Sequence, residues 1–265
     1  MPFRTDFPLH RPELLDMLRR GDALITAAMG KGNKRFRKGD EIIRTGEPCD
    51  TIFRLESGWA ARTRVLDDGR RSIIAVFLPG DLFGVKSLLL SEQPDSVHSL
   101  GNAVVQTIQH TRLRELFESE PSVALRIAFQ LGEDERRLHN YVIGLGRANA
   151  VERMATMLLE LHGRLGRAGL IQNGAYRCPM TQQEMADFLG LTPVHVNRVL
   201  RQLHGDGLAT VTRSMVQIDD MVGLHKLAQP VLDIFERAQP EFGGRAGLVN
   251  GPRRALGANP VPRSS

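Results

Sequence analysis

Cysteine is nearly absent from this chain of 265 residues, and the two that occur, Cys49 and Cys178, are far apart in sequence. This scarcity excludes a disulfide framework and a CxxC metal site. The eight histidines form no HxH or HxxxH pair, so we expect no structural zinc, no iron–sulfur site and no other bound metal. Cys49 is interpreted as an ordinary loop or strand residue, with a redox-sensing thiol as the alternative.

Long apolar runs are also absent. Stretches such as "SIIAVFL" (72–78) are far too short to span a bilayer. The N-terminal "MPFRTDFPLHRPELL" contains charges and prolines where a signal peptide needs an apolar core. These absences predict a cytoplasmic protein without a membrane partner.

Lysine is scarce as well, so most of the 35 basic residues are arginine, and the formal net charge is +5. A basic balance is typical of proteins that bind nucleic acid, and the arginine fork suits phosphate and guanine. A genome-wide composition bias would give the same skew, so the charge alone does not decide the function.

Changes of composition divide the chain into five segments. They are a helical lead-in, a strand-rich domain, a long helix with a glycine-bearing break suited to a hinge, a helix-turn-helix domain with a wing, and a C-terminal helix with a disordered basic tail. The expected ranges are 1–30, 31–120, 121–146, 147–225 and 226–265.

Short runs rich in Ile, Val, Phe and Thr alternate with turn signals between residues 34 and 110. The sequence "DDG" (67–69) predicts a hairpin turn, because glycine adopts positive φ at no steric cost. Many short strands with regular turns predict an antiparallel roll or barrel. We expect "VHSLGNAVVQTIQH" (97–110) to supply a closing pair of strands.

One long helix is predicted over about 122–145, after a break at Pro121. Mostly small or apolar side chains recur in it at alternating spacings of three and four residues, as in a coiled coil. We predict that this face is the seam of a homodimer; a core stripe packed on the roll is the alternative. The stripe consists of Ala124, Ala128, Leu131, Glu135, Leu138, Val142 and Leu145.

A helix pair is predicted in "TQQEMADFLGLTPVHVNRVLRQLHGDGL". Thr181 and Glu184 have the spacing of a capping box, which starts a short helix that ends near Leu189. Gly190 makes the turn. Thr192 then caps a second helix with proline at its first position, running to about His204, with Gly205 as its C-cap. Two short helices joined by a tight glycine turn form a helix-turn-helix.

The second helix has two different faces. Its apolar residues should pack against the first helix, whereas its polar face suits the major groove of double-stranded DNA, where arginine can bind guanine and an exposed valine can touch a thymine methyl. "LATVTRSMVQID" (208–219) predicts a β-hairpin wing. The expected DNA-binding residues are Thr192, Val194, His195, Asn197, Arg198 and Arg201, with Arg213 near the turn of the wing.

These motifs, in this order, resemble the Crp–Fnr superfamily of bacterial transcription regulators over about residues 30–225. The resemblance is carried by "KGDEIIRTGE", "LESGWAARTRVLDDGRR", "FLPGDLFG", the long helix and above all "TQQEMADFLGLTPVHVNRVLRQL". It implies an α+β fold with an N-terminal antiparallel β-roll of the cyclic-nucleotide-binding type, a long dimerisation helix and a C-terminal winged helix-turn-helix. It further implies a homodimer on a palindromic operator and contact with RNA polymerase.

The chain departs from the pattern of the superfamily at its sensor. Members that bind cyclic AMP carry a glutamate just after the "FG" glycine and an Arg-Ser pair further along. Here Val85 stands at the first position and Asp95-Ser96 at the second. We therefore expect no tight binding of cyclic AMP, predict no cofactor and leave the effector unknown. No cysteine precedes Cys49, unlike in members with an oxygen-sensing iron–sulfur cluster.

A second departure lies in the recognition helix, where Val194 replaces an acidic residue that is common in the family. Arg198 matches the family's guanine-reading arginine, and Asn197 a neighbouring contact position. The resemblance therefore implies that Arg198 reads a base.

Two other functions are compatible with parts of the pattern. A roll of this size occurs in cupin-like metal enzymes, but these need two or three histidines, and residues 34–105 contain only His98. No G-x-S-x-G or P-loop motif is present, so we do not expect an enzyme. A winged helix used only for protein contacts is the second alternative.

Overall fold

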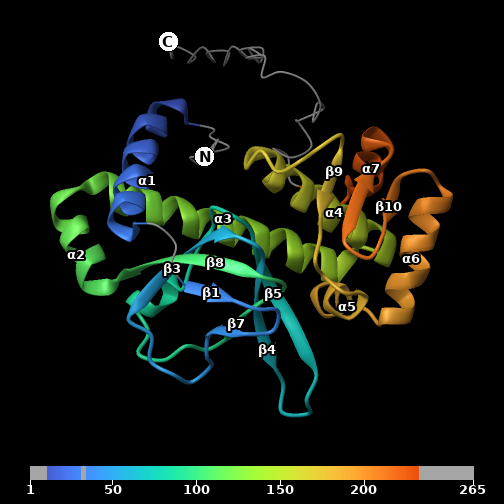
Figure 1. Ribbon diagram of the computed structural model, residues 1–265. Coiled ribbons are helices and arrows are strands. Elements are labelled where there is room, and N and C mark those ends of the chain that lie inside the picture. The colour runs from blue at the N-terminus through green and yellow to red at the C-terminus, as the bar shows by residue number, and fades with distance from the viewer. Residues whose placement is uncertain (1–10, 31–33, 233–265) are drawn as a thin grey trace, which may run out of the picture.

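The computed structural model describes residues 11–30 and 34–232, so the predicted basic tail lies outside the described residues. The described chain forms a β-roll, a long helix and a winged helix-turn-helix in that order (Figure 1). This arrangement confirms the predicted α+β fold. No helix among these residues is long and apolar enough to cross a bilayer.

The β-roll consists of two four-stranded antiparallel sheets with the strand orders β1-β8-β3-β6 and β2-β7-β4-β5. Phe53, Leu55 and Phe83 of the first sheet and Ile43 and Phe77 of the second share one buried cluster. Alternating side chains of short strands thus close a core between the sheets. The strands are β1 (Lys34–Phe36), β2 (Glu41–Ile43), β3 (Thr51–Ser57), β4 (Ala60–Val65), β5 (Arg71–Phe77), β6 (Leu82–Phe83), β7 (Ser96–Ser99) and β8 (Ala103–Gln109).

The turns of the roll follow the predicted glycines. Gly69 has φ 83° in the hairpin between β4 and β5, as expected for "DDG". The closing strands β7 and β8 also form, but they do not pair with each other, because β7 joins β2 and β4 whereas β8 joins β1 and β3. The closing segment therefore crosses from one sheet to the other.

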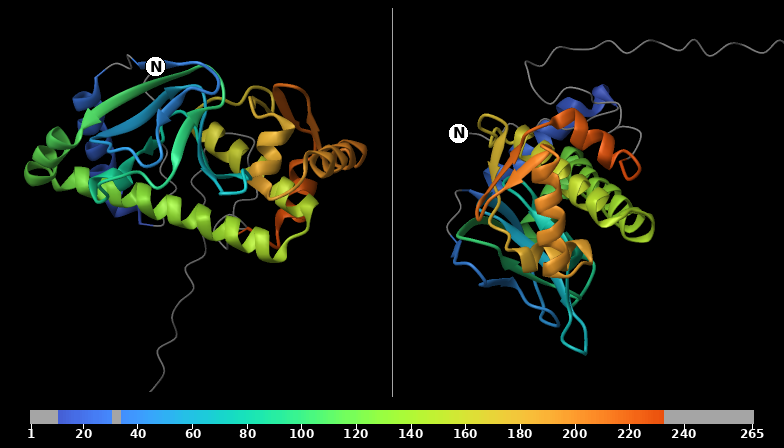
Figure 2. Two further views of the ribbon diagram at one scale, coloured as in Figure 1. Left: turned by 90° about the horizontal axis from the view of Figure 1, so that it is seen from below. Right: turned by 90° about the vertical axis from the view of Figure 1, so that its right-hand side faces the viewer.

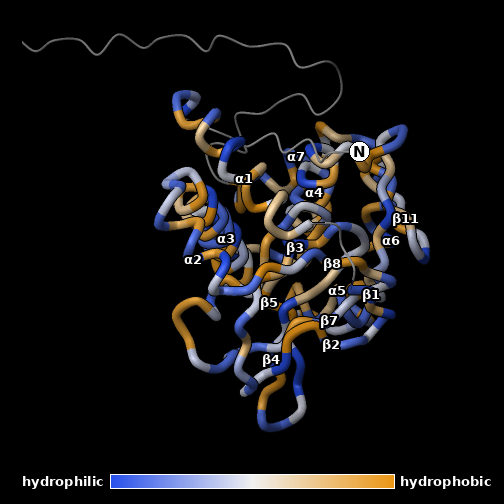
Figure 3. Tube along the Cα trace, turned by 60° about the vertical axis from the view of Figure 1, so that its left-hand side comes forward, coloured by the Kyte–Doolittle hydropathy of each residue, from blue (hydrophilic) through white to orange (hydrophobic). Residues whose placement is uncertain are grey.

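Helices cover one side of the roll (Figure 2). They are a short 3-10 turn (Pro12–Leu14), α1 (Leu15–Met29), α2 (His110–Ser119) and α3 (Pro121–Arg147), and a second 3-10 turn (Val85–Leu88) follows β6. A Cβ at Gly21 of α1 would lie 2.1 Å from the carbonyl oxygen of Ser122, so glycine is what allows α1 to cross directly on α3. Orange and blue segments alternate along α2 and α3 in Figure 3, as expected for amphipathic helices.

The long helix extends further than predicted. Gly144 and Gly146 are helical, and α3 ends at Arg147, so the break falls at Ala148 and Asn149. Asn149 then starts the next helix, because its side chain accepts hydrogen bonds from the backbone of Val151 and Glu152. A strong capping signal outweighs the glycines, which cost only about 1 kcal/mol each inside a helix.

The C-terminal part is a winged helix. It contains α4 (Ala150–Arg167), β9 (Ala175–Arg177), α5 (Gln182–Leu189), α6 (Pro193–Gly205), β10 (Ala209–Val211), β11 (Met215–Ile218) and α7 (Met221–Ala228). The predicted wing is a hairpin of β10 and β11, and β9 completes a sheet in the order β10-β11-β9. Strand β9 was not predicted from the sequence. The expected division at residue 225 falls inside α7, which packs on α4.

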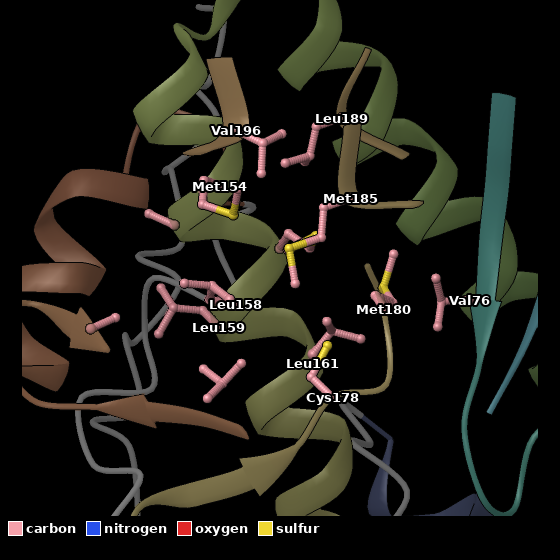
Figure 4. Close-up of a cluster of buried hydrophobic side chains, with 14 of the residues drawn as sticks. Val76, Met154, Leu158, Leu159, Leu161, Cys178, Met180, Met185, Leu189 and Val196 are labelled. Atoms are coloured by element: carbon pink, nitrogen blue, oxygen red, sulfur yellow. The ribbon is translucent and has the colours of Figure 1, made fainter. Parts of the chain in front are cut away.

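One hydrophobic core joins the winged helix to the roll. Val76 of β5 and Trp59 beside β4 belong to the same buried cluster as Met154 of α4 and Met185 of α5. Figure 4 shows Val76 facing Met180 across this junction. Arg164 of α4 reinforces it, since its guanidinium pairs with Asp81 and donates to the carbonyl oxygen of Val76 at 2.8 Å.

Candidate nucleic-acid interface

Helix α5 is started by the predicted capping box. The backbone N–H of Glu184 donates to Oγ1 of Thr181 at 3.2 Å, and the N–H of Thr181 donates to the Glu184 carboxylate at 2.6 Å. Gly190 ends the helix with φ 62° and ψ 42°. This left-handed conformation is strained for residues with a Cβ, so the turn between the two helices depends on glycine.

Helix α6 begins as predicted and ends slightly later. The backbone N–H of His195 donates to Oγ1 of Thr192 at 3.2 Å, and Pro193 occupies the first turn. The last helical residue is Gly205 and the C-cap is Asp206, so the prediction of Gly205 as C-cap is wrong. Gly207, with φ 68°, is the residue that allows the chain to reverse.

The two faces of α6 separate as the spacing predicts. Val196, Val199 and Leu203 are buried in the core with Met185 and Leu189 of α5. The opposite face is open: the Val194 side chain is 80% exposed, and Arg198 and Arg201 are exposed too. Thr192 is exposed, while His195 and Asn197 are half-buried at the edges of this face. The predicted DNA-contacting residues of α6 therefore share one accessible surface.

Two hydrogen bonds organise that surface. Nη2 of Arg198 donates to Nε2 of His195 at 2.8 Å, and the imidazole nitrogen must be the acceptor because a guanidinium has no acceptor atom. The Asn197 amide donates to Oε1 of Gln182 at 3.4 Å, which links α6 to the first turn of α5. His195 thus positions Arg198, a role that residue spacing alone did not indicate.

Arg213 is exposed in the turn between β10 and β11, as predicted. The wing is tied to α6 at its base, where Nδ1 of His204 and Oγ1 of Thr210 lie 3.0 Å apart and Thr210 donates to Asp219 at 2.7 Å. A cation at the tip of a hairpin held beside a recognition helix is suited to a phosphate contact.

The predicted seam of α3 is exposed along its length in this single chain. Leu131, Leu138, Val142 and Leu145 are between 43% and 57% exposed, and Ala128 is exposed as well. The opposite face of α3 is the one that packs on α1 and the roll, through residues such as Val123 and Ile127. The alternative of a core stripe packed on the roll is therefore wrong.

Val85 and Asp95 stand where members that bind cyclic AMP carry a glutamate and an arginine, so the charges at these two positions differ from those of a cyclic-nucleotide site. Val85 is buried, and the carboxylate of Asp95 lies 2.7 Å from Arg64 and 3.7 Å from Lys86. The described residues contain no group of three or more metal-ligating side chains. Burial raises the pKa of the Cys178 thiol to about 11, and the Cys49 thiol donates to the carbonyl oxygen of Thr51.

Sequence reasoning missed the contacts between the roll and the winged helix. Arg71 pairs with Asp187 of α5 at 2.7 Å, and Lys38 lies 3.5 Å from the capping residue Glu184. Their partners are more than 100 residues away in sequence, so no periodicity could have indicated them.

A β-roll, a long helix with an exposed apolar stripe and a winged helix-turn-helix with a free recognition face define a class, the DNA-binding transcription regulators. Residues 33–120 match the family described as "Cyclic nucleotide-binding domain", and residues 152–227 match "Crp-like helix-turn-helix domain".

Related proteins agree with these matches. The transcriptional activator protein FnrA of Stutzerimonas stutzeri is 28% identical over 203 residues, which cover 77% of this chain and 83% of that protein. The transcriptional activator protein anr of Pseudomonas aeruginosa is 28% identical over 75% of this chain and 81% of its own length. The structure of FixK2 from Bradyrhizobium japonicum has a TM-score of 0.68 at 28% identity and covers 75% of this chain and 98% of its own.

The chain belongs to the Crp–Fnr family of transcription regulators. Members of this family are regulators, not enzymes, so the cupin-like alternative is wrong. The predicted fold and the helix-turn-helix are confirmed, while the base-reading role of individual residues, the dimer and the signal stay predictions.

Proposed function

We propose that this protein is a cytoplasmic homodimer that binds a palindromic operator in a sequence-specific way and contacts RNA polymerase there. The observation that carries the proposal is the open face of α6, on which Val194, Arg198 and Arg201 are exposed while the other face is buried. Such a helix fits the major groove, with Arg198 forking onto guanine and Arg201 and Arg213 on phosphates. Val194 favours a thymine methyl.

The exposed stripe of α3 supports the homodimer. Two copies joined along this helix would place their α6 helices about 34 Å apart, one turn of B-DNA. The two half-sites would then be related by the two-fold axis of the protein, which is why the operator is expected to be palindromic.

Selection of bound DNA from a random library, with the full chain, tests this proposal. We expect an enriched palindrome whose half-site centres are about one helical turn apart. If no motif is enriched, and DNA binding varies with salt concentration but not with base sequence, the result would favour non-specific DNA binding or a winged helix used for protein contacts.

We further propose that activity is set by a signal at the β-roll and that this signal is not cyclic AMP. A nucleotide phosphate at the Asp95 position would meet a carboxylate, and Val85 cannot accept a bond from a ribose hydroxyl. Loss of one charge-assisted bond costs about 1.5–3 kcal/mol. Calorimetry should therefore detect no tight binding; micromolar cyclic AMP binding would contradict this.

A further inference from the structure

Two ion pairs hold α5 over one face of the β-roll. Arg71 lies on β5 and pairs with Asp187 at 2.7 Å, and Lys38, just before β2, pairs with Glu184 at 3.5 Å. Strands β2 and β5 are the two edges of the sheet β2-β7-β4-β5, so α5 reaches across this sheet, and Figure 1 shows it beside β5. Side chains that the inner strands β7 and β4 place on this face are therefore close to the winged helix.

His98 of β7 lies on this covered face. The residue directly opposite it on β4 is Ala61, and residues paired in this way share one face of a sheet. Ala61 is buried in a common core with Met185 of α5. His98 is thus a titratable side chain at the contact between the roll and the winged helix.

The imidazole of His98 is bonded at one nitrogen. Nδ1 lies 3.3 Å from Oγ1 of Thr63, whereas Nε2 is shielded from solvent and has no hydrogen-bond partner among the described residues. The neutral ring with its hydrogen on Nδ1 fits this setting, because it leaves just an acceptor unbonded. A proton on Nε2 would instead be a buried donor without an acceptor, and it would bring a charge with it.

The charged groups that face His98 do not offer that acceptor. They are Arg71 of β5, Glu41 of β2, and Glu184 and Asp187 of α5. Each of the three carboxylates already has a cation, since Glu41 pairs with Arg44 at 3.3 Å and the other two pair with Lys38 and Arg71. Burial and Arg71 lower the pKa of His98 from its ordinary value of 6.5, and the carboxylates oppose this only in part.

We propose that His98 makes the docking of the winged helix on the β-roll depend on pH, so that uptake of one proton at Nε2 releases α5 from the roll. The proton lacks an acceptor in the docked form, whereas water supplies one after release. Because the released form binds the proton more tightly, acid shifts the equilibrium toward release. Docking is at full strength above pH 6.5 and weakens as the pH falls from there through the docked-state pKa of His98.

Trp59 provides a direct readout of docking. It is the single tryptophan of the chain, and it is buried in the core that joins the roll to the winged helix. Release would expose its indole to water, so its emission would shift to longer wavelength and acrylamide would quench it more strongly. We expect both changes in the full chain between about pH 7.5 and about pH 5.5, while circular dichroism shows that the secondary structure is retained.

His98→Gln tests the assignment to this residue. Glutamine is polar but cannot take up a proton, so the emission of this variant should be the same at both pH values. His110→Gln is the matched control. Burial also lowers the pKa of His110, but this residue starts α2 and its Nε2 lies 2.8 Å from Oγ of Ser87. The control variant should therefore keep the shift of the wild type.

A second variant, Glu41→Gln, leaves His98 in place and keeps the test decisive if His98→Gln is already released at neutral pH. It removes a carboxylate that favours the protonated imidazole, so the midpoint of the emission change should move to lower pH. The proposal is wrong if the wild-type emission is the same at both pH values, if a docked His98→Gln keeps the shift, or if Glu41→Gln leaves the midpoint unchanged. Loss of secondary structure together with the shift would also contradict it, because acid would then unfold the chain instead of releasing α5.

Discussion

Gly190 shows how a single residue holds the reading helix in place. A Cβ at this position would lie 3.0 Å from Cδ2 of Leu145, and the backbone has φ 62°. We expect Gly190→Ala to destabilise the fold by about 1–2 kcal/mol, because an L side chain is strained in the left-handed region. Urea unfolding monitored by circular dichroism measures this loss.

Gly205→Ala is the matched control for that prediction. Gly205 is helical, and nothing lies within 4 Å of the position of its Cβ. Alanine there should be neutral or stabilise the protein by up to about 1 kcal/mol. Equal losses for both variants would show that the turn at Gly190 is not the cause.

Residues whose partners are close in sequence could be predicted, and the others could not. Thr181 and Glu184 form a bond pattern that spans one helical turn, so their spacing is sufficient evidence. Arg126, in contrast, is buried and bonds Asp22 of α1 at 2.9 Å. A buried arginine looks like any other charged helix residue in the sequence, because its pairing depends on how α1 crosses α3.

At the scale of elements, α3 carries the clearest prediction. Leu138→Asp combined with Val142→Asp would place charges in the proposed dimer seam, and a buried unpaired carboxylate costs several kcal/mol. Analytical ultracentrifugation should then find a monomer where the wild type is a dimer.

The control for the seam variant introduces the same charges elsewhere. Leu170 and Val222 are exposed at 44% and 59% and belong to the winged helix. Leu170→Asp with Val222→Asp should remain dimeric. A dimeric seam variant would mean that the interface lies on another surface.

Most elements could be predicted from periodicity and capping, and the exceptions have physical causes. Strand β9 has three residues and joins the sheet through β11, so it is too short to show an alternating pattern. Strands β7 and β8 were expected, but their separation into two sheets depends on the closure of the whole roll.

At the scale of the whole molecule, the buried pair of Asp81 and Arg164 joins the roll to the winged helix. Burial acts to raise the pKa of Asp81, but Arg164, Arg137 and a bond from the Leu78 N–H outweigh it, so the pKa lies below 3.8. A carboxyl group whose pKa is lower in the folded than in the unfolded state stabilises the folded protein at pH values above the unfolded pKa. This stabilisation is lost as pH falls through the folded value.

Asp81→Asn should therefore cost about 3–5 kcal/mol near pH 7, since it leaves Arg164 without its main partner. The difference from the wild type should be constant above about pH 5 and shrink below pH 3.8. Denaturant unfolding at several pH values measures it. The control is Asp68→Asn, in an exposed pair with Arg70, which should change the free energy of unfolding by about 0.5 kcal/mol or less. If the difference between Asp81→Asn and the wild type stays constant down to about pH 3, the lowered pKa assigned to Asp81 is wrong.

The central claim is that the open face of α6 reads the operator sequence. Competition binding against operators permuted one base at a time tests it most directly, with wild type, Arg198→Ala and Arg201→Ala compared. Arg198→Ala should cost about 1–3 kcal/mol per half-site and relax the preference at one symmetric guanine. Arg201→Ala should weaken binding to all sequences alike and flatten the salt slope by about one unit. If both variants keep the base preferences of the wild type, this face of α6 is not the reading face.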